Sequence, residues 1–327
     1  MSEQHTKDIH RYSYSRLSTF KMCPRRHHYT YIEQLPEPQN EYALSGSLFH
    51  KAIEYVLTGK DTDEVYQEWH EAVDQGRMKI ERDLLEYIVN LYFTHYYKDY
   101  NEEETVIVEQ TFNKPLDGED YFVTKLDQAY RLRGLLGVRD TKTTRGQLKY
   151  NLENVSNNMQ LLTYVPAVEN YLNEKVDFIE IDEVRLAKLA TEVPLIKNGK
   201  PSTSLEMLSL VTADLYREEL QKQNLLNDQK YQNVLFLLEQ RGHPLFNRVR
   251  VQLLNRNILD SNEEEIESIY TAASIDTKYR IKDHAKCFMC PFKQICEHDE
   301  QIGGEKFREQ LIENIWFNVL TSISNSI

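Results

Sequence analysis

Residues 121–142 read YFVTKLDQAYRLRGLLGVRDTK and give the clearest indication of the fold. Apolar and polar residues alternate over 121–126 and again over 135–140, a pattern typical of β-strands. Gly134 marks a turn between the two runs. The stretch therefore predicts two adjacent antiparallel strands.

Acidic residues end both predicted strands, with Asp127 lying 13 positions before Asp140. Neighbouring antiparallel strands can bring two carboxylates within a few ångströms, close enough for one Mg²⁺ or Mn²⁺ ion. Lys142 follows Asp140 by two positions, so both side chains share a face of the strand. A metal-bound water beside an ammonium group suits phosphodiester hydrolysis. An Asp-x-Lys pair alone is also common on solvated edge strands.

The sequence on either side of these two strands predicts the remaining strands and the helices. Apolar residues at helical spacing precede the strands, and a further strand begins near Thr105. We expect a helix over 154–172 and a strand over 176–184. Residues 203–240 predict two more helices, and 245–253 an extended segment. This order predicts an α/β fold with helices on the faces of a mixed sheet.

We expect one domain over all 327 residues. It divides into an N-terminal helix with the first cysteine (1–45), a catalytic core (46–186), a helical insertion (187–242) and a C-terminal part with three cysteines (243–327).

Three further residues accompany the two carboxylates and the lysine. His50 lies early on a predicted helix, directly after a Ser-Gly turn. Gln160 and Tyr164 lie one helical turn apart, so they share a face of the following helix. A lone histidine in such a place is more often structural. The metal site is therefore predicted from all six residues together and not from His50 alone.

Four segments, in order, resemble the RecB-like nucleases of the PD-(D/E)XK superfamily: GSLFH (46–50), KLD (125–127), RDTK (139–142) and NMQLLTY (158–164). The resemblance implies a restriction-endonuclease-like core and a DNA nuclease that uses Mg²⁺ or Mn²⁺. Residue by residue, it implies His50, Asp127 and Asp140 as metal ligands, Lys142 as catalytic, and Gln160 and Tyr164 as supporting residues that contact DNA.

This chain departs from the family pattern at two positions. Lys125 stands where the family often has Gly, and Asp140 where it often has Glu. Neither change removes a ligand. Glu109, on the preceding strand, is a candidate extra carboxylate, but we expect a structural or solvent-facing role and leave it out of the primary site.

The chain has four cysteines: Cys23, Cys287, Cys290 and Cys296. Four thiolates can hold a 4Fe-4S cluster or Zn²⁺. A lone cysteine followed by C-x2-C-x5-C resembles the iron-sulfur staple of several RecB-like nucleases, including the AddB type and the CRISPR adaptation nucleases. The resemblance implies a 4Fe-4S cluster that joins the N- and C-terminal parts. Zinc is the alternative, although structural zinc more often uses paired C-x2-C knuckles.

The charge balance limits how the protein meets nucleic acid. Against 39 Lys and Arg stand 52 Asp and Glu, a net charge of -13, which argues against coating DNA through bulk charge. The acidic block at 263–265 reads as a solvated loop or helix start. Arg248 and Arg250 share one face of an extended strand, either solvated or spaced to meet successive phosphates.

No stretch approaches the roughly 18 apolar residues that a membrane span needs, and the first residues lack the apolar run of a secretory signal. We expect a cytoplasmic protein, of a bacterial cell or a phage-infected host, with no membrane partner. No G-x4-G-K-[ST] motif is present, so helicase action would come from a helicase or recombination partner.

Free-standing relatives of this layout act as exonucleases on DNA ends, often in phage or CRISPR settings. The resemblance therefore implies an exonuclease on DNA ends or single strands, in recombination, repair or end processing. Two alternatives stay open: a CRISPR-type or structure-specific endonuclease, and a non-catalytic iron-sulfur subunit that binds DNA.

Overall fold

A six-stranded mixed sheet forms the centre of the computed structural model, which describes residues 10–37, 40–275, 287–288 and 290–300. The strand order is β1-β3-β4-β5-β6, and β2 pairs with β3 outside this path. The pairs β1–β3 and β4–β5 are parallel, and the other pairs are antiparallel. The strands are β1 Arg11–Ser13, β2 Glu103–Pro115, β3 Tyr121–Leu132, β4 Leu135–Thr144, β5 Phe178–Arg185 and β6 Phe246–Gln252.

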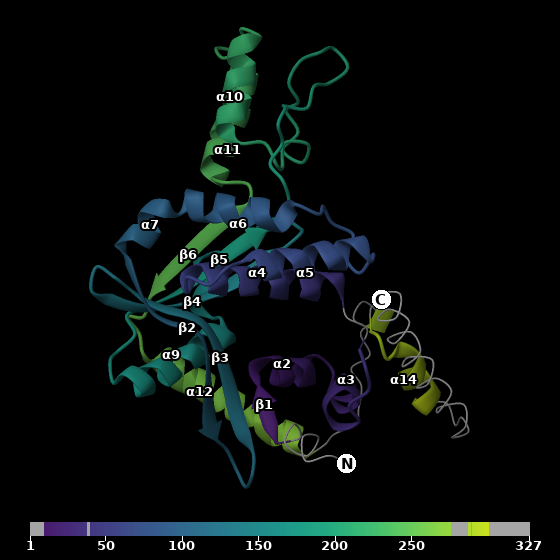
Figure 1. The fold of residues 1–327 in the computed structure, drawn as a ribbon, viewed down its shortest axis with the longest axis vertical. Coiled ribbons are helices and arrows are strands. Elements are labelled where there is room, and N and C mark those ends of the chain that lie inside the picture. Colours follow the sequence, from purple (N-terminus) through teal and green to yellow (C-terminus); the bar gives the residue numbers. More distant parts are fainter. Residues whose placement is uncertain (1–9, 38–39, 276–286, 289, 301–327) are drawn as a thin grey trace.

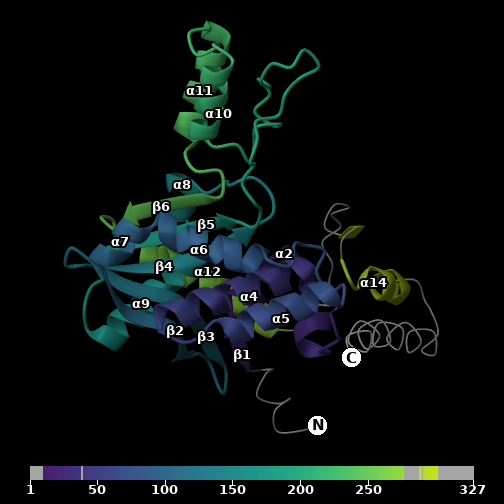
Figure 2. The same ribbon diagram turned by 45° about the horizontal axis from the view of Figure 1, so that its top comes forward.

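Helices cover both faces of the sheet (Figures 1 and 2). One face carries α4 (Glu41–Leu57), α5 (Asp63–Asp74), α6 (Leu84–His95) and the short α7 (Tyr97–Glu102). The other face carries α8 (Leu152–Ser156), α9 (Met159–Leu172) and α12 (Asn257–Ser274). The restriction-endonuclease-like α/β sheet with flanking helices, expected from the sequence, is confirmed.

Strand β5 shows why the sheet is covered on both sides. Ile179 and Ile181 pack into the apolar cluster around α9, while Val184 packs into the cluster around α4 to α6. Successive side chains of a strand point to opposite faces, so a strand that is apolar on both must be buried on both.

The N-terminal segment continues from β1 into α2 (Tyr14–Met22), α3 (Pro24–His27) and the π-helix η1 (His28–Ile32). Ser13 caps α2, because its side chain accepts a hydrogen bond from the backbone N–H of Arg16. The chain turns at Cys23, just before Pro24, which is the first residue of α3. Helix α14 (Lys293–Glu300) is linked to this segment because Phe292, just before it, packs against Tyr29.

Helices α10 (Ala213–Lys222) and α11 (Gln229–Arg241) project from the sheet as an arm (Figures 1 and 2). The arm has an apolar cluster of its own, in which Tyr216 and Leu220 of α10 pack with Leu238 of α11. None of the helices in the described ranges is long and apolar enough to cross a membrane.

Several elements differ from the expectation. Strand β1 and helix α5 were not predicted, and α12 runs straight through the acidic block at 263–265. Helix α12 has few large apolar residues, and its buried positions include Asn262 and Ala273, so its apolar stripe is weak.

Candidate metal centre

Strands β3 and β4 separate where their two aspartates meet. The ladder runs from Leu132 opposite Leu135 to Gln128 opposite Arg139 and then stops. Asp127 and Asp140 are next on each strand. The backbone N–H of Thr141 donates to Asp127 Oδ2 at 2.9 Å instead of to a strand carbonyl. The hairpin thus opens with both carboxylates at the fork.

Asp127 belongs to a group of three ligand-type side chains. His50 Nδ1 lies 3.3 Å from Asp127 Oδ2. One ligand atom each from His50, Glu109 and Asp127 lies within 4.8 Å of the other two, and the described ranges contain no other such group of His, Cys, Asp or Glu. Helix α4 supplies the imidazole, and β2 and β3 supply the carboxylates.

Glu109 was left out of the primary site on sequence grounds, and the structure places it there. Val108 pairs with Gln128 and Gln110 with Leu126, so Glu109 lies across from Asp127. Its backbone has φ 49°, a left-handed conformation that costs a non-glycine residue about 1 kcal/mol or more. Only the register of β2 against β3, invisible in the sequence pattern, brings Glu109 to the fork.

Asp140 belongs to a closed ring of contacts with three other predicted residues. The Lys142 ammonium lies 2.8 Å from Asp140 Oδ2 and donates to Gln160 Oε1 at 2.6 Å. Gln160 Nε2 donates to the Tyr164 hydroxyl at 2.8 Å, and this hydroxyl donates to Asp140 Oδ1 at 3.0 Å. Asp140 is only 1% exposed. The ring leaves the Lys142 ammonium little freedom to turn away from Asp140.

Electrostatics push the pKa values of the two aspartates apart. Burial acts to raise the pKa of Asp127, but the hydrogen bond and charge of His50 and the Thr141 amide hold it below its usual value. Burial raises the pKa of Asp140 and the charge of Asp127 adds to this, while Lys142 opposes both. Each aspartate of the fork therefore has one side-chain nitrogen partner, His50 for Asp127 and Lys142 for Asp140.

The pKa values of the His50 imidazole and the Lys142 ammonium are both raised by the neighbouring carboxylates. Burial acts to lower the pKa of His50, yet Asp127, Asp140 and Glu109 raise it above the usual value. Burial also acts to lower the pKa of Lys142, and Asp140 raises it. An imidazole nitrogen and carboxylate oxygens together suit a divalent cation such as Mg²⁺ or Mn²⁺.

A second carboxylate, missed from the sequence, holds the loop beside Lys142. Glu183 lies opposite Lys142 in the β4–β5 register and is 1% exposed. Its Oε2 accepts from the backbone N–H groups of Lys149 at 2.7 Å and Tyr150 at 3.0 Å. Asn247 Nδ2 donates to the Tyr150 carbonyl at 2.9 Å. Three acidic residues within one predicted strand, Glu180, Asp182 and Glu183, were the available signal.

The expectation for Arg248 and Arg250 is wrong. Arg248 Nη2 lies 2.5 Å from Asp182 Oδ2, and Arg250 Nη2 lies 2.7 Å from Glu180 Oε2. Both carboxylates are fully buried. The two arginines therefore neutralise buried carboxylates between the sheet and α6–α7. The side chain of Arg248 is 10% exposed and that of Arg250 is 31% exposed.

The four cysteines come from both ends of the described chain. Burial raises the pKa of Cys290, Phe292 N–H and Arg26 act to lower it, and the thiols of Cys23 and Cys296 raise it further. Arg25 Nη1 lies 3.9 Å from Cys296 Sγ. The sulfur atoms do not gather closely enough to count among the ligand groups of the described residues.

Residues 11–297 match a family described as the PD-(D/E)XK nuclease superfamily. No curated protein matches the chain. A solved structure titled "Crystal structure of SSO0001" is similar with 12% sequence identity and a TM-score of 0.36, over 89% of this chain and 93% of that chain.

Proposed function

The chain belongs to the PD-(D/E)XK nuclease superfamily, and from this premise we propose that it hydrolyses phosphodiester bonds of DNA at the fork between β3 and β4. Membership implies a metal-dependent nuclease. The observation that carries the proposal is the Lys142 ammonium, held 2.8 Å from Asp140 beside the group of His50, Glu109 and Asp127.

His50 and Asp127, with Asp140 and Glu109 beside them, would hold the Mg²⁺ or Mn²⁺ ion. When bound, such an ion lowers the pKa of water and neutralises charge on the phosphate. Lys142 orients the attacking water or stabilises charge that develops on the phosphate. Gln160 and Tyr164 fix the Lys142 ammonium and the Asp140 carboxylate. Tyr164 is only 2% exposed, so the DNA contact expected of both residues is proposed for Gln160 alone.

We further propose an exonuclease that acts on DNA ends or single strands in recombination, repair or end processing. Support comes from the likeness of the four motif segments to free-standing RecB-like nucleases. On the same ground we propose a cytoplasmic location and cooperation with a helicase or recombination partner. An endonuclease and a non-catalytic DNA-binding subunit are the rival functions.

The cysteines, we propose, bind a 4Fe-4S cluster that joins the N-terminal segment to α14. Their spacing, a lone cysteine followed by C-x2-C-x5-C, supports this, as does the packing of Phe292 on Tyr29, which brings the two ends of the described chain together. Anaerobically purified protein should be brown and contain four irons per chain, as expected for this cluster type. Colourless protein with one zinc per chain would show a zinc site instead.

The nuclease is tested with end-labelled linear DNA and closed circular DNA in Mg²⁺ or Mn²⁺, beside an Asp140→Ala control. Degradation of linear DNA alone, lost in the control, supports an exonuclease, and the end that loses label first gives the polarity. Cutting of the circle points to an endonuclease. If neither substrate is cleaved, the binding-subunit function replaces the proposal.

A further inference from the structure

Two arginines at the base of the arm have no carboxylate partner among the described residues. Arg185 is the last residue of β5, and Arg241 is the last residue of α11. Arg185 Nη1 donates to the carbonyl of Ser209 at 3.2 Å. Arg241 donates from Nη1 and Nη2 to the carbonyls of Leu208 and Val211, at 3.0 and 2.6 Å. Both guanidinium groups thus bind one segment, 208–211, and bring their positive charges close together.

The pKa values of the two arginines reflect this arrangement. Burial lowers the pKa of Arg185, and no carboxylate acts against it. Burial also lowers the pKa of Arg241, and the positive charge of Arg185 lowers it further. The pKa of Arg248 shows the opposite effect, because Asp182 raises it in spite of burial. Like charges that are partly buried and not neutralised are unfavourable, so the two arginines favour an anion between protein and solvent.

An anion in solution can reach these side chains. Arg241 is exposed, and Arg185 is partly exposed. The Nε of Arg185 is buried without a partner and lies out of reach of an anion. Its Nη2 is not buried in this way, and it forms no hydrogen bond with a described residue. Arg185 Nη2 is therefore available as a donor, and Arg241 adds its charge beside it.

Strand register places Arg185 on the same face of the sheet as Lys142. Strands β4 and β5 are parallel, with Lys142 opposite Glu183 and Thr144 opposite Arg185. Side chains two positions apart on a strand share a face. Two residues along and one strand across put the Cα atoms of Lys142 and Arg185 about 8 Å apart. A DNA strand carries a phosphate at about every 3.4 Å of the duplex axis, so a strand held at Lys142 has another phosphate within reach of Arg185.

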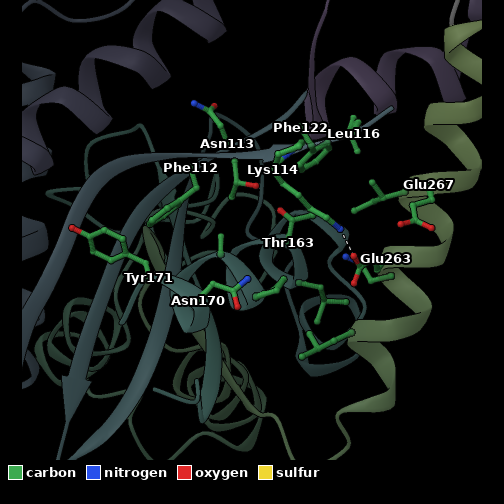
Figure 3. A pocket seen from close by; sticks show the side chains of 18 residues that line it. Phe112, Asn113, Lys114, Leu116, Phe122, Thr163, Asn170, Tyr171, Glu263 and Glu267 are labelled. Atoms are coloured by element: carbon green, nitrogen blue, oxygen red, sulfur yellow. Dashed lines mark hydrogen bonds and ion pairs between the residues drawn. The ribbon is translucent and has the colours of Figure 1, made fainter. Parts of the chain in front are cut away.

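The surface beyond α9, on the side of α12, does not favour phosphates. A cavity of about 520 Å³ lies there, between the β2–β3 hairpin, α9 and α12 (Figure 3). The ammonium of Lys114 in its wall is already paired with Glu263. Helix α12 has no Lys or Arg, and it has five acidic residues: Asp260, Glu263, Glu264, Glu265 and Glu267. This charge repels DNA, which is therefore expected to extend from the fork toward the arm.

We propose that Arg185 and Arg241 bind a backbone phosphate of the DNA strand that is cleaved at Lys142, on the side of the arm. A guanidinium N–H forms a charge-assisted hydrogen bond with a phosphate oxygen, which is stronger than a neutral one. The proposal rests on the proposed function, because it takes DNA as the ligand. Binding of this phosphate needs neither metal nor cleavage, so the two proposals fail separately.

The test measures binding of the full chain, in EDTA, to a fluorescent DNA hairpin with a ten-nucleotide single-stranded tail. Arg185→Gln removes the charge and keeps an N–H donor for Ser209. Its affinity should fall by about tenfold, the worth of one hydrogen bond to a charged group. The slope of log affinity against log salt should become shallower by about 0.7 to 0.9, the effect of one lost phosphate contact. Arg185→Lys should keep the slope.

Lys175→Gln is the matched control. It removes one positive charge at an exposed position just before β5, at the opposite end of that strand from Arg185. The salt slope should stay unchanged in this variant. The midpoint of urea unfolding separates binding from folding: Arg185→Gln should leave it unchanged or raise it, because the guanidinium that is removed is not neutralised in the unaltered chain.

Four results would overturn the proposal. The unaltered chain could fail to bind the hairpin, or Arg185→Gln could bind it with unchanged affinity and slope. Equal effects of Arg185→Gln and Lys175→Gln would show that only net charge matters. Weaker binding by Arg185→Gln together with a lower unfolding midpoint would make Arg185 a structural residue. In each case, cleavage of the same hairpin by the unaltered chain in Mn²⁺ would leave the proposed function standing.

Discussion

The Tyr164 hydroxyl links Gln160, whose side chain binds the Lys142 ammonium, to the Asp140 carboxylate. It accepts a hydrogen bond from Gln160 Nε2 and donates one to Asp140 Oδ1, so it connects helix α9 to this buried carboxylate of β4. Residues that orient metal ligands typically change activity by about 10- to 100-fold when altered. Altering Tyr164 should therefore change catalysis, although its side chain is not itself a metal ligand.

Tyr164→Phe removes one oxygen and leaves Asp140 Oδ1 and Gln160 Nε2 without this partner. We expect kcat for DNA cleavage to fall by about 10-fold or more, and the free energy of unfolding to fall by about 1–3 kcal/mol. Kinetics and urea titration measure the two effects. Tyr171→Phe, at an exposed position of the same helix, is the matched control. If Tyr164→Phe and Tyr171→Phe had equal effects, the hydrogen bonds of the Tyr164 hydroxyl would have no special role in the site.

His50 gives the metal-free protein a pH dependence. Its folded pKa is raised above the usual 6.5 by the surrounding carboxylates. The resulting stability is fully present below pH 6.5 and is lost as pH rises through the folded pKa. Melting in EDTA should therefore occur at higher temperature at pH 6 than at pH 8.

His50→Asn should reduce that pH difference, because the titrating imidazole is absent. With metal the sign reverses: the proton and Mn²⁺ compete for His50, so Mn²⁺ affinity should rise with pH. A Mn²⁺ affinity that is constant between pH 6 and pH 8 would count against His50 as a ligand.

At the scale of elements, strand β5 links the metal centre to a buried charge network. Asp182 and Glu180 point toward α6, where Arg248 and Arg250 of β6 neutralise them. Arg139 of β4 lies 2.6 Å from Glu180, so three strands share the network. Removing one partner of a buried pair leaves an uncompensated charge, which costs more than the pair contributes.

Arg248→Met keeps the side-chain length and removes the charge beside Asp182. We expect the free energy of unfolding to fall by about 3–5 kcal/mol. Arg133→Met, at an exposed pair with Glu102, should change it by less than about 0.5 kcal/mol. Urea titration distinguishes them. If the Arg248→Met protein had normal stability but bound DNA more weakly, Arg248 would instead be a residue that contacts DNA phosphates.

We expect Glu183 to hold the loop that follows β4 in the position that activity requires. Glu183→Ala frees the backbone N–H groups of Lys149 and Tyr150. We expect kcat to fall by about 10-fold, since Lys142 loses its ordered neighbour. Glu183→Gln keeps an oxygen acceptor and should retain most of the activity. A Gln variant as impaired as the Ala variant would show that the charge of Glu183, and not its hydrogen bonds, matters.

The sequence predicted the elements whose patterns are local. The hairpin of β3 and β4 and helix α9 have clear periodicity, and through them Asp127, Asp140, Lys142, Gln160 and Tyr164 were named as candidates. Glu109 was named as a candidate but left out of the primary site, and Glu183 was not named, because strand register, which no local pattern contains, places both. Arg248 was misread because its partner Asp182 lies 66 residues away in the chain.

On the scale of the whole molecule, the sheet lies between two helical layers, and the arm of α10 and α11 projects beyond it (Figure 1). Asp140 and Lys142 of the metal centre and the buried charge network lie on opposite faces of the sheet. Arg248→Met should therefore act mainly on stability, whereas Tyr164→Phe should lower both stability and cleavage.

The most direct test of the central claim is anomalous diffraction from crystals soaked in Mn²⁺. The account predicts a Mn²⁺ peak at the fork, in contact with His50 and Asp127 and next to Asp140 or Glu109, and no peak there in Asp127→Asn crystals. DNA cleavage by a protein whose fork binds no Mn²⁺ would contradict it, because the reaction would then take place elsewhere.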